Sequence, residues 1–394
     1  MSNGRSEKDR VFYLFRVVGI ALMALSAFAR AETAFAQPDP NWKQKWEKVL
    51  SQAKREGKVV VLGSPGELIR DALTQGFRKA FPAIGIDYAA ARGAELAAKL
   101  KAERDGGIYS TDVVVSGTTT ALIYFKPMAA LAPIKPVLIL PEVTDRNNWR
   151  NRALEFADKA ASYNLVFSDN VLPPVFYDPK QGKPEEISRL HDLLQPKWQG
   201  KIVINDPIPS GPGNVIFRWI WRMLGPEKAI DYYRRLRAQA AVVDRDQRRQ
   251  IEWVAQGRYA ILLAPSSAVG EQLAQRGLKF GVLPEFSDYG APITAGFGSL
   301  MLIDKAPHPN AAAVYVNWLL SGDGQKAWSK AVNAASHRVD VPPDHVSPHL
   351  VPKPGARLWV SHYKPGERYW ISHNEENVHR SAEEETILKE LFGR

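Results

Sequence analysis

The chain contains no cysteine among its 394 residues. No disulfide, thiolate zinc site, iron–sulfur cluster or cysteine nucleophile can therefore form, and the fold must be stabilised by packing. Common enzyme signatures are missing as well: there is no Gly-x-Ser-x-Gly elbow, His-Glu-x-x-His pair, Walker loop or Gly-x-Gly-x-x-Gly turn. These motifs would have indicated an enzyme, although catalytic groups can also lie far apart along a chain. We expect no catalytic residue, no cofactor and no enzymatic activity.

Long apolar runs are also scarce, because only residues 17–29 form an uncharged apolar stretch of any length. At about 13 residues this stretch is too short for a bilayer core, which needs roughly 20. Basic residues precede it, and Ala34 and Ala36 follow at the two positions that a signal peptidase reads. We therefore expect residues 1–36 to be a signal peptide that delivers the protein outside the cytoplasm. An uncleaved membrane anchor is the alternative.

Size and charge limit the remaining classes of protein. About 358 residues follow the expected cleavage position, which suits two domains better than one compact core. The formal net charge of +10 falls to about +8 without residues 1–36, which contain five basic and three acidic residues. The basic residues are scattered apart from one cluster at residues 234–249, and no nucleic-acid-reading motif accompanies it. The positive charge is compatible with an anionic lipid or an anionic small ligand, and we expect no nucleic-acid partner.

Short runs of Val, Ile and Leu alternate with helical patterns along most of the chain. The expected strands are residues 58–63, 84–89, 111–116, 201–205, 240–244, 259–265, 278–284 and 297–303. The expected helices are residues 42–55, 67–80, 95–103, 215–224, 227–237, 245–256, 267–275 and 310–319. Strands of this composition are buried on both faces, and their alternation with helices predicts an α/β fold with largely parallel sheets.

Two irregular stretches, at about residues 127–196 and 286–294, interrupt this alternation. They predict that the chain leaves a first lobe, builds a second lobe and then returns. The expected lobes are residues 37–163 with 294–394, and residues 164–293. The Gly-rich residues 290–299 would bend where the chain crosses, since a hinge needs only a few residues that absorb dihedral change. The Pro-rich tail ends in an amphipathic pattern, which we expect to be a helix packed on the first lobe.

Four loops follow expected strands, open helices, and are rich in small residues, hydroxyls and free backbone N–H groups. These loops are residues 63–66, 91–95, 116–120 and 206–214. A helix N-terminus attracts anions, and ligands of open α/β sheets bind beyond the carboxyl ends of the strands. Ordinary turn and capping roles are the alternative for each loop alone. Together the four loops predict a shared ligand cleft.

Three charged residues stand out at these junctions. Arg92 and Arg245 occupy strand–helix junctions, where a guanidinium could hold a carboxylate or phosphate through two hydrogen bonds. A surface ion pair is the alternative for each arginine. Asp206 opens the fourth loop, where it could bind a cation or cap the turn, and we favour the cap.

Histidines gather in the tail, since six of the eight follow Ser336. His345 and His349 are four residues apart, but Pro348 lies between them and further prolines precede them. Proline disrupts helices, so this spacing does not predict the helical two-histidine pair of a zinc site. The sequence therefore predicts no metal site.

Six motifs follow one another in an order that resembles a known family. They are WEKVLSQAKREGKVVVLG (46–63), FRKAFP (77–82), RGAELAAK (92–99), QPKWQGKI (195–202), GRYAILLAP (257–265) and KAPHPNAAAVYVNWLLSGDGQKAWS (305–329). The chain resembles the periplasmic solute-binding proteins of ABC importers, family 1 with type 2 topology, which include ferric-iron, thiamine and polyamine binders. The resemblance implies two α/β lobes joined by crossing strands. It also implies a monomer that traps a ligand between the lobes and delivers it to an inner-membrane ABC permease.

The resemblance also implies which residues face the ligand. Carried over to this chain, these are Ser64, Pro65, Arg92, Gly93, Ser116, Gly117, Ser210, Gly211, Ser266 and Ser267. With Asp206 and Arg245 they form the predicted site. The ferric-iron members use two adjacent tyrosines near the cleft, but the only tandem pair here, Tyr232 and Tyr233, falls inside an expected packing helix. We therefore expect a small organic or phosphate-bearing anion. Fe(III) binding within the same family, or a secreted hydrolase with an anionic substrate, are the alternatives.

Overall fold

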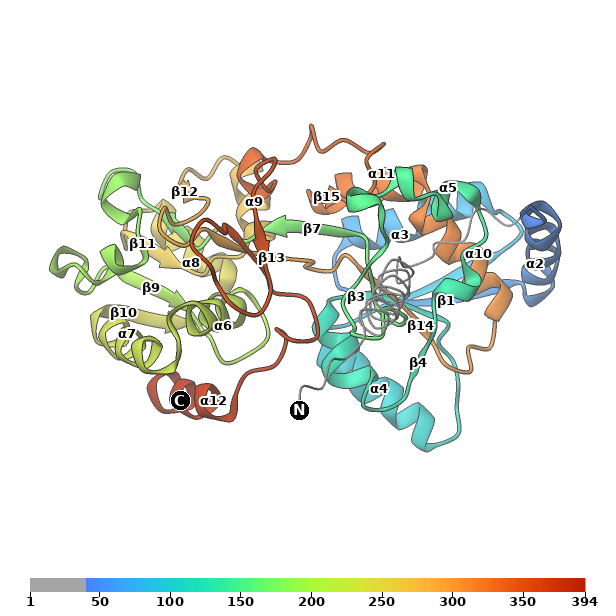
Figure 1. Ribbon diagram of the computed structural model, residues 1–394, viewed down its shortest axis with the longest axis horizontal. Helices are drawn as coiled ribbons and strands as arrows, with labels where there is room; N and C mark the ends of the chain where they lie inside the picture. Colours follow the sequence, from blue (N-terminus) through green and yellow to red (C-terminus); the bar gives the residue numbers. More distant parts are fainter. Residues whose placement is uncertain (1–39, 394) are drawn as a thin grey trace, which may run out of the picture.

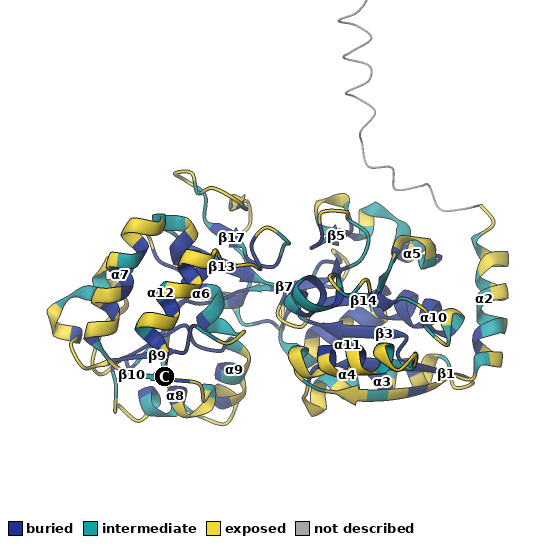
Figure 2. Cartoon of the chain, turned by 90° about the horizontal axis from the view of Figure 1, so that it is seen from below, coloured by how far each residue is buried: buried dark blue, intermediate teal, exposed yellow. Residues whose placement is uncertain are grey.

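A computed structural model describes residues 40–393 of the chain, and the expected signal peptide lies outside these residues. The chain forms two lobes side by side, with a few strands between them (Figure 1). In each lobe, buried strands are enclosed by helices whose outer faces are exposed (Figure 2). No helix in residues 40–393 combines the length and apolarity needed to cross a membrane.

The first lobe is built on a sheet with the strand order β2-β1-β3-β14-β6-β5, and β4 also pairs with β14. Its strands are β1 (Lys58–Gly63), β2 (Gly85–Ala90), β3 (Val113–Ser116), β4 (Leu131–Ala132), β5 (Glu155–Phe156), β6 (Leu165–Val166) and β14 (Ser299–Ile303). Its helices are α2 (Trp42–Glu56), α3 (Glu67–Ala80), α4 (Gly93–Asp105), α5 (Pro141–Thr144), α10 (Pro309–Leu320) and α11 (Gly322–Val332). The β1, β2 and β3 strands are parallel, as the continuous Val and Leu runs of β1 and β3 predict.

The second lobe is built on a five-stranded sheet with the order β10-β9-β11-β8-β12. Its strands are β8 (Val175–Tyr177), β9 (Ile202–Asn205), β10 (Ala240–Asp244), β11 (Ile261–Leu263) and β12 (Gly281–Leu283). Its helices are α6 (Pro212–Leu224), α7 (Pro226–Gln239), α8 (Gln247–Ala255) and α9 (Ser267–Gln275). The β9, β10 and β11 strands are parallel, and all four residues of β9 are buried.

A third sheet with the order β15-β7-β13-β17-β16 lies between the lobes. Its strands are β7 (Ser168–Val171), β13 (Ala291–Thr294), β15 (Ala335–Ser336), β16 (Leu358–Trp359) and β17 (Tyr369–Ile371). The β7 strand leads into the second lobe and β13 leads back (Figure 1). Gly290, just before β13, has a φ of 73°, and a Cβ there would overlap the carbonyl oxygen of Arg368. Only glycine fits this crossing point.

The last helix, α12 (Ala382–Phe392), corrects one expectation. We expected it on the first lobe, but it packs against α7, and the Phe392 ring lies 5.1 Å from that of Phe217 on α6. Leu388 and Phe392 belong to the apolar core of the second lobe. An amphipathic pattern predicts that a helix has an apolar face, but not which core that face covers. The other lobe boundaries remain a prediction.

Candidate functional site

Three candidate loops of the first lobe lie side by side at one edge of its sheet. In the strand register, Gly63 at the end of β1 is opposite both Ala90 of β2 and Val115 of β3. The loops that follow these strands therefore leave the sheet together. The β1 strand starts beside α2 at the outer end of the lobe and runs inward (Figure 1), which directs these loops toward the second lobe.

Two of these loops contain a buried serine that forms a hydrogen bond. Ser64 is buried, and its carbonyl oxygen accepts a hydrogen bond from the Tyr88 hydroxyl at 2.8 Å. The Ser116 hydroxyl is also buried and lies 3.2 Å from the Thr120 hydroxyl. Pro65 is exposed, and Gly117 is partly exposed. A ligand could therefore reach the backbone at Pro65 and Gly117, whereas the Ser64 carbonyl and the Ser116 hydroxyl make contacts within the lobe.

Arg92 precedes α4 and is exposed. Its backbone N–H donates to the Glu95 carboxylate at 3.1 Å, which closes the first turn of the helix. Within residues 40–393 its guanidinium has neither a hydrogen bond nor an ion pair. The next residue, Gly93, is partly exposed, and a Cβ there would overlap the Thr120 hydroxyl. An unpaired guanidinium thus lies at the positive end of the α4 helix dipole. The guanidinium and the helix dipole both favour an anion at this position.

The second lobe repeats this arrangement at its own sheet edge. Asp244 at the end of β10 is opposite Asn205 of β9, and Leu263 of β11 is opposite Ile204. The β9 arrow points toward the first lobe (Figure 1), so the loops after β9, β10 and β11 are directed toward the loops described above. The predicted site residues therefore form two sets of six, one on each lobe.

Asp206 and Arg245 lie together and form an ion pair with each other. One carboxylate oxygen of the buried Asp206 accepts from the Ile208 N–H at 2.9 Å, and the other accepts from Arg245 Nε at 2.7 Å. Asp206 therefore fixes the turn, as expected for a capping residue. For Arg245 the structure has the ion pair that was the alternative, so its charge is already compensated.

The remaining residues of the second set lie at helix N-termini. Ser210 is exposed and Gly211, partly exposed, precedes α6 with a φ of 148°. The Gly213 N–H donates to the Asn205 side chain at 3.1 Å. Ser266 caps α9 by accepting from the Val269 N–H at 3.5 Å. The Ser267 hydroxyl is buried and has no hydrogen-bond partner in the described residues.

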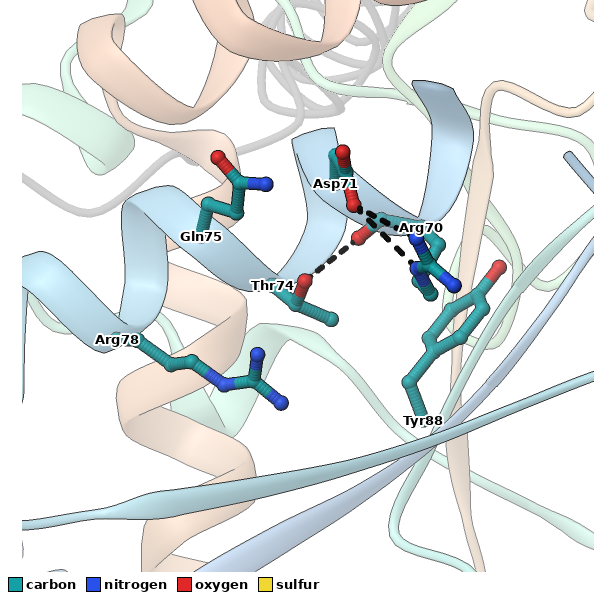
Figure 3. Close-up of a pocket in the computed structure, with 6 residues that line it drawn as sticks. All are labelled: Arg70, Asp71, Thr74, Gln75, Arg78 and Tyr88. Atoms are coloured by element: carbon teal, nitrogen blue, oxygen red, sulfur yellow. Dashed lines mark hydrogen bonds and ion pairs between the residues drawn. The ribbon is translucent and has the colours of Figure 1, made fainter. Parts of the chain in front are cut away.

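A cavity that the sequence did not indicate lies on the first lobe, between α3 and β2 (Figure 3). Its volume is about 410 Å³, and it is lined by Arg70, Asp71, Thr74, Gln75, Arg78 and Tyr88. Arg70 is paired with Asp71 at 3.3 Å, and Arg78 donates to the carbonyl oxygen of Ile86. Burial raises the pKa of Tyr88 to about 12, so this hydroxyl stays protonated and keeps donating to Ser64. The cavity wall therefore supports the first candidate loop.

One group of metal-ligating side chains gathers within residues 40–393, at Glu155, Asp169 and His337. The Arg150 guanidinium donates to Asp169 at 2.7 and 2.9 Å and to Glu155 at 3.0 Å. Burial raises the pKa of Glu155, but the neighbouring His337 and His373 more than offset this and lower it to about 2. Because a guanidinium already compensates both carboxylates, we interpret the group as an ion-pair network that joins β5, β7 and the segment after α11.

The tandem tyrosines lie inside α7, as predicted. Tyr232 and Tyr233 are buried, and their hydroxyls donate to the carbonyl oxygens of Leu190 and Phe217. Burial raises the pKa of both hydroxyls above the ordinary value. Neither oxygen is therefore available as a phenolate ligand for iron.

Comparisons with known proteins fit this architecture. The model of the family described as "bacterial extracellular solute-binding protein" matches residues 72–348. No curated protein sequence matches the chain. Three similar solved structures share its fold at low sequence identity.

The first of these structures is the periplasmic binding protein AfuA from Actinobacillus pleuropneumoniae with exogenous fructose 6-phosphate bound. It is 16% identical, covers 85% of this chain and 97% of its own, and has a TM-score of 0.56. Iron-bound HitA from Pseudomonas aeruginosa is 15% identical, covers 85% and 99%, and has a TM-score of 0.60. The ferric binding protein from Campylobacter jejuni is 13% identical, covers 84% and 99%, and has a TM-score of 0.62.

Proposed function

Because the chain belongs to the family of bacterial extracellular solute-binding proteins, and is therefore a receptor of the ABC-importer type, we propose that its ligand is a small organic or phosphate-bearing anion. The protein would be exported to the periplasm through residues 1–36, bind the anion as a monomer without chemical change, and deliver it to an inner-membrane ABC permease.

The unpaired guanidinium of Arg92 carries this proposal. It lies at the N-terminus of α4, beside two further loops that end on the same sheet edge. Burying an anion is costly unless charged groups or N–H donors compensate it. Arg92 offers a charge-assisted fork, and the loops after β1 and β3 offer backbone N–H groups. These groups suit a phosphate or carboxylate better than a cation.

Hinge closure is the mechanism that this architecture supports. The β7 and β13 strands join the lobes, and each lobe offers its loops toward the other. A ligand that contacts both sets of loops binds a closed form better than an open one and shifts the population toward closure. A permease then recognises the closed form.

Fe(III) is the second candidate, because two of the similar structures are named as iron-bound or ferric binding proteins. Against it, the tandem tyrosines of this chain are buried and hydrogen-bonded within α7. The predicted site contains hydroxyls, backbone amides and two arginines, with Asp206 as its one carboxylate. This set favours an anion over a bare ferric ion.

A thermal-shift screen of the exported protein tests the proposal. The probes are inorganic phosphate, fructose 6-phosphate, citrate, thiamine, spermidine and Fe(III). A ligand at 100 times its Kd stabilises the folded state by about 2.7 kcal/mol, which is a shift of several degrees. We expect at least one anion to raise Tm and to bind in calorimetry. A shift with Fe(III), thiamine or spermidine alone would contradict the anion proposal.

A further inference from the structure

The C-terminal segment, residues 349–394, lies beyond the part of the chain that matches the family. It nevertheless contacts both lobes. Its α12 helix contributes Leu388 and Phe392 to the core of the second lobe. Upstream, the Glu375 carboxylate pairs with Lys126 and accepts from the Lys159 N–H at 2.7 Å, both on the first lobe. The segment therefore crosses from one lobe to the other between Glu375 and α12.

Arg380 lies in this crossing, directly before the α12 cap Ser381. Its guanidinium donates to the carbonyl oxygens of Pro207 and Ile208 in the loop after β9. That loop contains the candidate residues Asp206, Ser210 and Gly211. Only 10% of the Arg380 side chain is exposed, so the contact is held inside the protein rather than at its surface.

The loop is fixed from two sides. Asp206 holds it from within through the Ile208 N–H. Arg380 holds the carbonyl oxygens of Pro207 and Ile208 from outside the loop, since it belongs to the C-terminal segment. The Pro207 carbonyl and the Ile208 N–H belong to one planar peptide unit, so Arg380 and Asp206 together fix the orientation of that unit. The Ile208 carbonyl is joined to Pro209, which has no N–H, so there Arg380 fixes the path of the chain and not an N–H group. The backbone N–H groups of Ser210 and Gly211, which lead into α6, follow directly from this fixed turn.

Excess positive charge accompanies Arg380. Arg218 on α6 is 3% exposed, and its Nη1 has no hydrogen-bond partner in the described part of the chain. Arg222 on the same helix lies near enough to interact with both Arg218 and Glu384. Glu384 on α12, 2% exposed and 3.7 Å from Arg380, is the carboxylate that faces these arginines. Three guanidinium groups therefore face the Glu384 carboxyl group, and Arg380 also interacts with Glu385 and with Asp206 of the loop.

We call the six predicted site residues of each lobe a half-site. We propose that Arg380 is a positioning residue of the second half-site: it orients the turn at residues 206–211 and, with Arg218, makes that turn electropositive. The proposal rests on the proposed function, since it assigns the C-terminal segment a part in binding the same anion. Glu384 partly compensates the positive charge of the arginines. Its effect on the potential at the turn is therefore opposite to that of Arg380, although both residues lie at the N-terminus of α12. The C-terminal segment thus contributes to specificity and not only to the stability of the second lobe.

The orienting role is tested in the ligand-free protein by amide hydrogen exchange. The variants are Arg380→Ala, Arg380→Lys and the control Lys389→Ala, whose exposed side chain pairs with Glu385 elsewhere on α12. We expect at least tenfold faster exchange of the hydrogen-bonded Ile208 and Gly213 amides in both Arg380 variants, and no change in the control. Unchanged exchange in Arg380→Ala and Arg380→Lys, with α12 still protected, overturns the proposal.

The electrostatic role is tested by calorimetry with fructose 6-phosphate and inorganic phosphate. We expect Arg380→Gln to weaken binding at least fivefold and Glu384→Gln to tighten it about twofold. A purely structural role would weaken binding in both variants, and that result overturns the proposal. If the wild-type protein binds no anion at all, the proposed function fails, whereas the exchange experiment still decides whether Arg380 orients the loop.

Discussion

The two lobes present the same arrangement of loops but compensate their arginines differently. In the first lobe, the Arg92 guanidinium has no partner in the described residues and lies at a helix N-terminus. In the second, Arg245 is paired at 2.7 Å with Asp206, which is itself buried. The first lobe therefore has charge to offer a ligand, whereas the second is already balanced at this position. We infer that the anion docks on the first lobe and that the second lobe closes on it with backbone amides.

The largest expected effect is a loss of folding stability when a glycine in the loops of either half-site is replaced by alanine. A Cβ at Gly213 would overlap the carbonyl oxygens of Asn205 and Asp206, whereas a Cβ at Gly93 would meet the rotatable Thr120 hydroxyl. We expect Gly213→Ala to destabilise the protein by about 3 kcal/mol and Gly93→Ala by less than about 1 kcal/mol. Chemical unfolding measures both, and equal losses would contradict the idea that the second half-site is the more rigid.

A smaller effect concerns buried carboxyl groups. Close to β7, the histidines His337 and His373 lower the pKa of Glu155 to about 2 despite its burial. In the second lobe, burial raises the pKa of Glu384 to about 7, and the neighbouring arginines only partly offset this. Unfolding returns each carboxyl to its ordinary value near 4.5. The two groups therefore respond to pH in opposite directions.

For Glu384 the folded-state pKa lies above the unfolded value, so the folded protein favours the neutral acid. The loss of folding free energy that ionised Glu384 causes is absent below about pH 4.5, grows as the pH rises, and is complete above about pH 7. We expect Glu384→Gln to stabilise the protein by roughly 2–3 kcal/mol at pH 8 and by almost nothing at pH 4.5. Tm of both proteins against pH measures this. A constant difference across that range would contradict the assignment.

The smallest effect in free energy is the most informative about binding. We expect Arg92→Ala to weaken binding of the anion by more than tenfold, about 1.4 kcal/mol, because it removes the unpaired charge. Arg245→Ala should weaken it by less than threefold, since that charge is already compensated by Asp206. Calorimetry with the anion that stabilises the wild-type protein most distinguishes the two. Unchanged affinity in Arg92→Ala would remove Arg92 from the site.

Much of the fold followed from local patterns. The predicted ranges of β1, β10, α3 and α9 agree with the structure residue for residue, because continuous apolar runs and amphipathic periods are local signals. The α11 helix was not predicted, since it begins with Gly322-Asp323-Gly324, which reads as a loop. Its N-cap Ser321 and its packing against α3 stabilise it in spite of these glycines.

The candidate site, like the fold, could be predicted only in part from the sequence. Loops that follow buried parallel strands can be read from the sequence, because strand order brings their ends to one edge. The partners of individual side chains cannot be read in this manner. Asp206 pairs with a residue 39 positions away, and Tyr88 supports Ser64 from a neighbouring strand. No sequence signal distinguishes the paired Arg245 from the unpaired Arg92.

The sequence by itself determined the α/β alternation, the irregular stretches and the loops rich in backbone N–H groups, because hydrophobic period and turn chemistry act over a few residues. Only the tertiary structure decided which arginine has its charge compensated by a carboxylate, which lobe α12 covers, and that Arg380 reaches a loop more than 170 residues earlier in the chain. Electrostatic compensation and packing depend on distances between segments, and these distances exist only once the chain has folded.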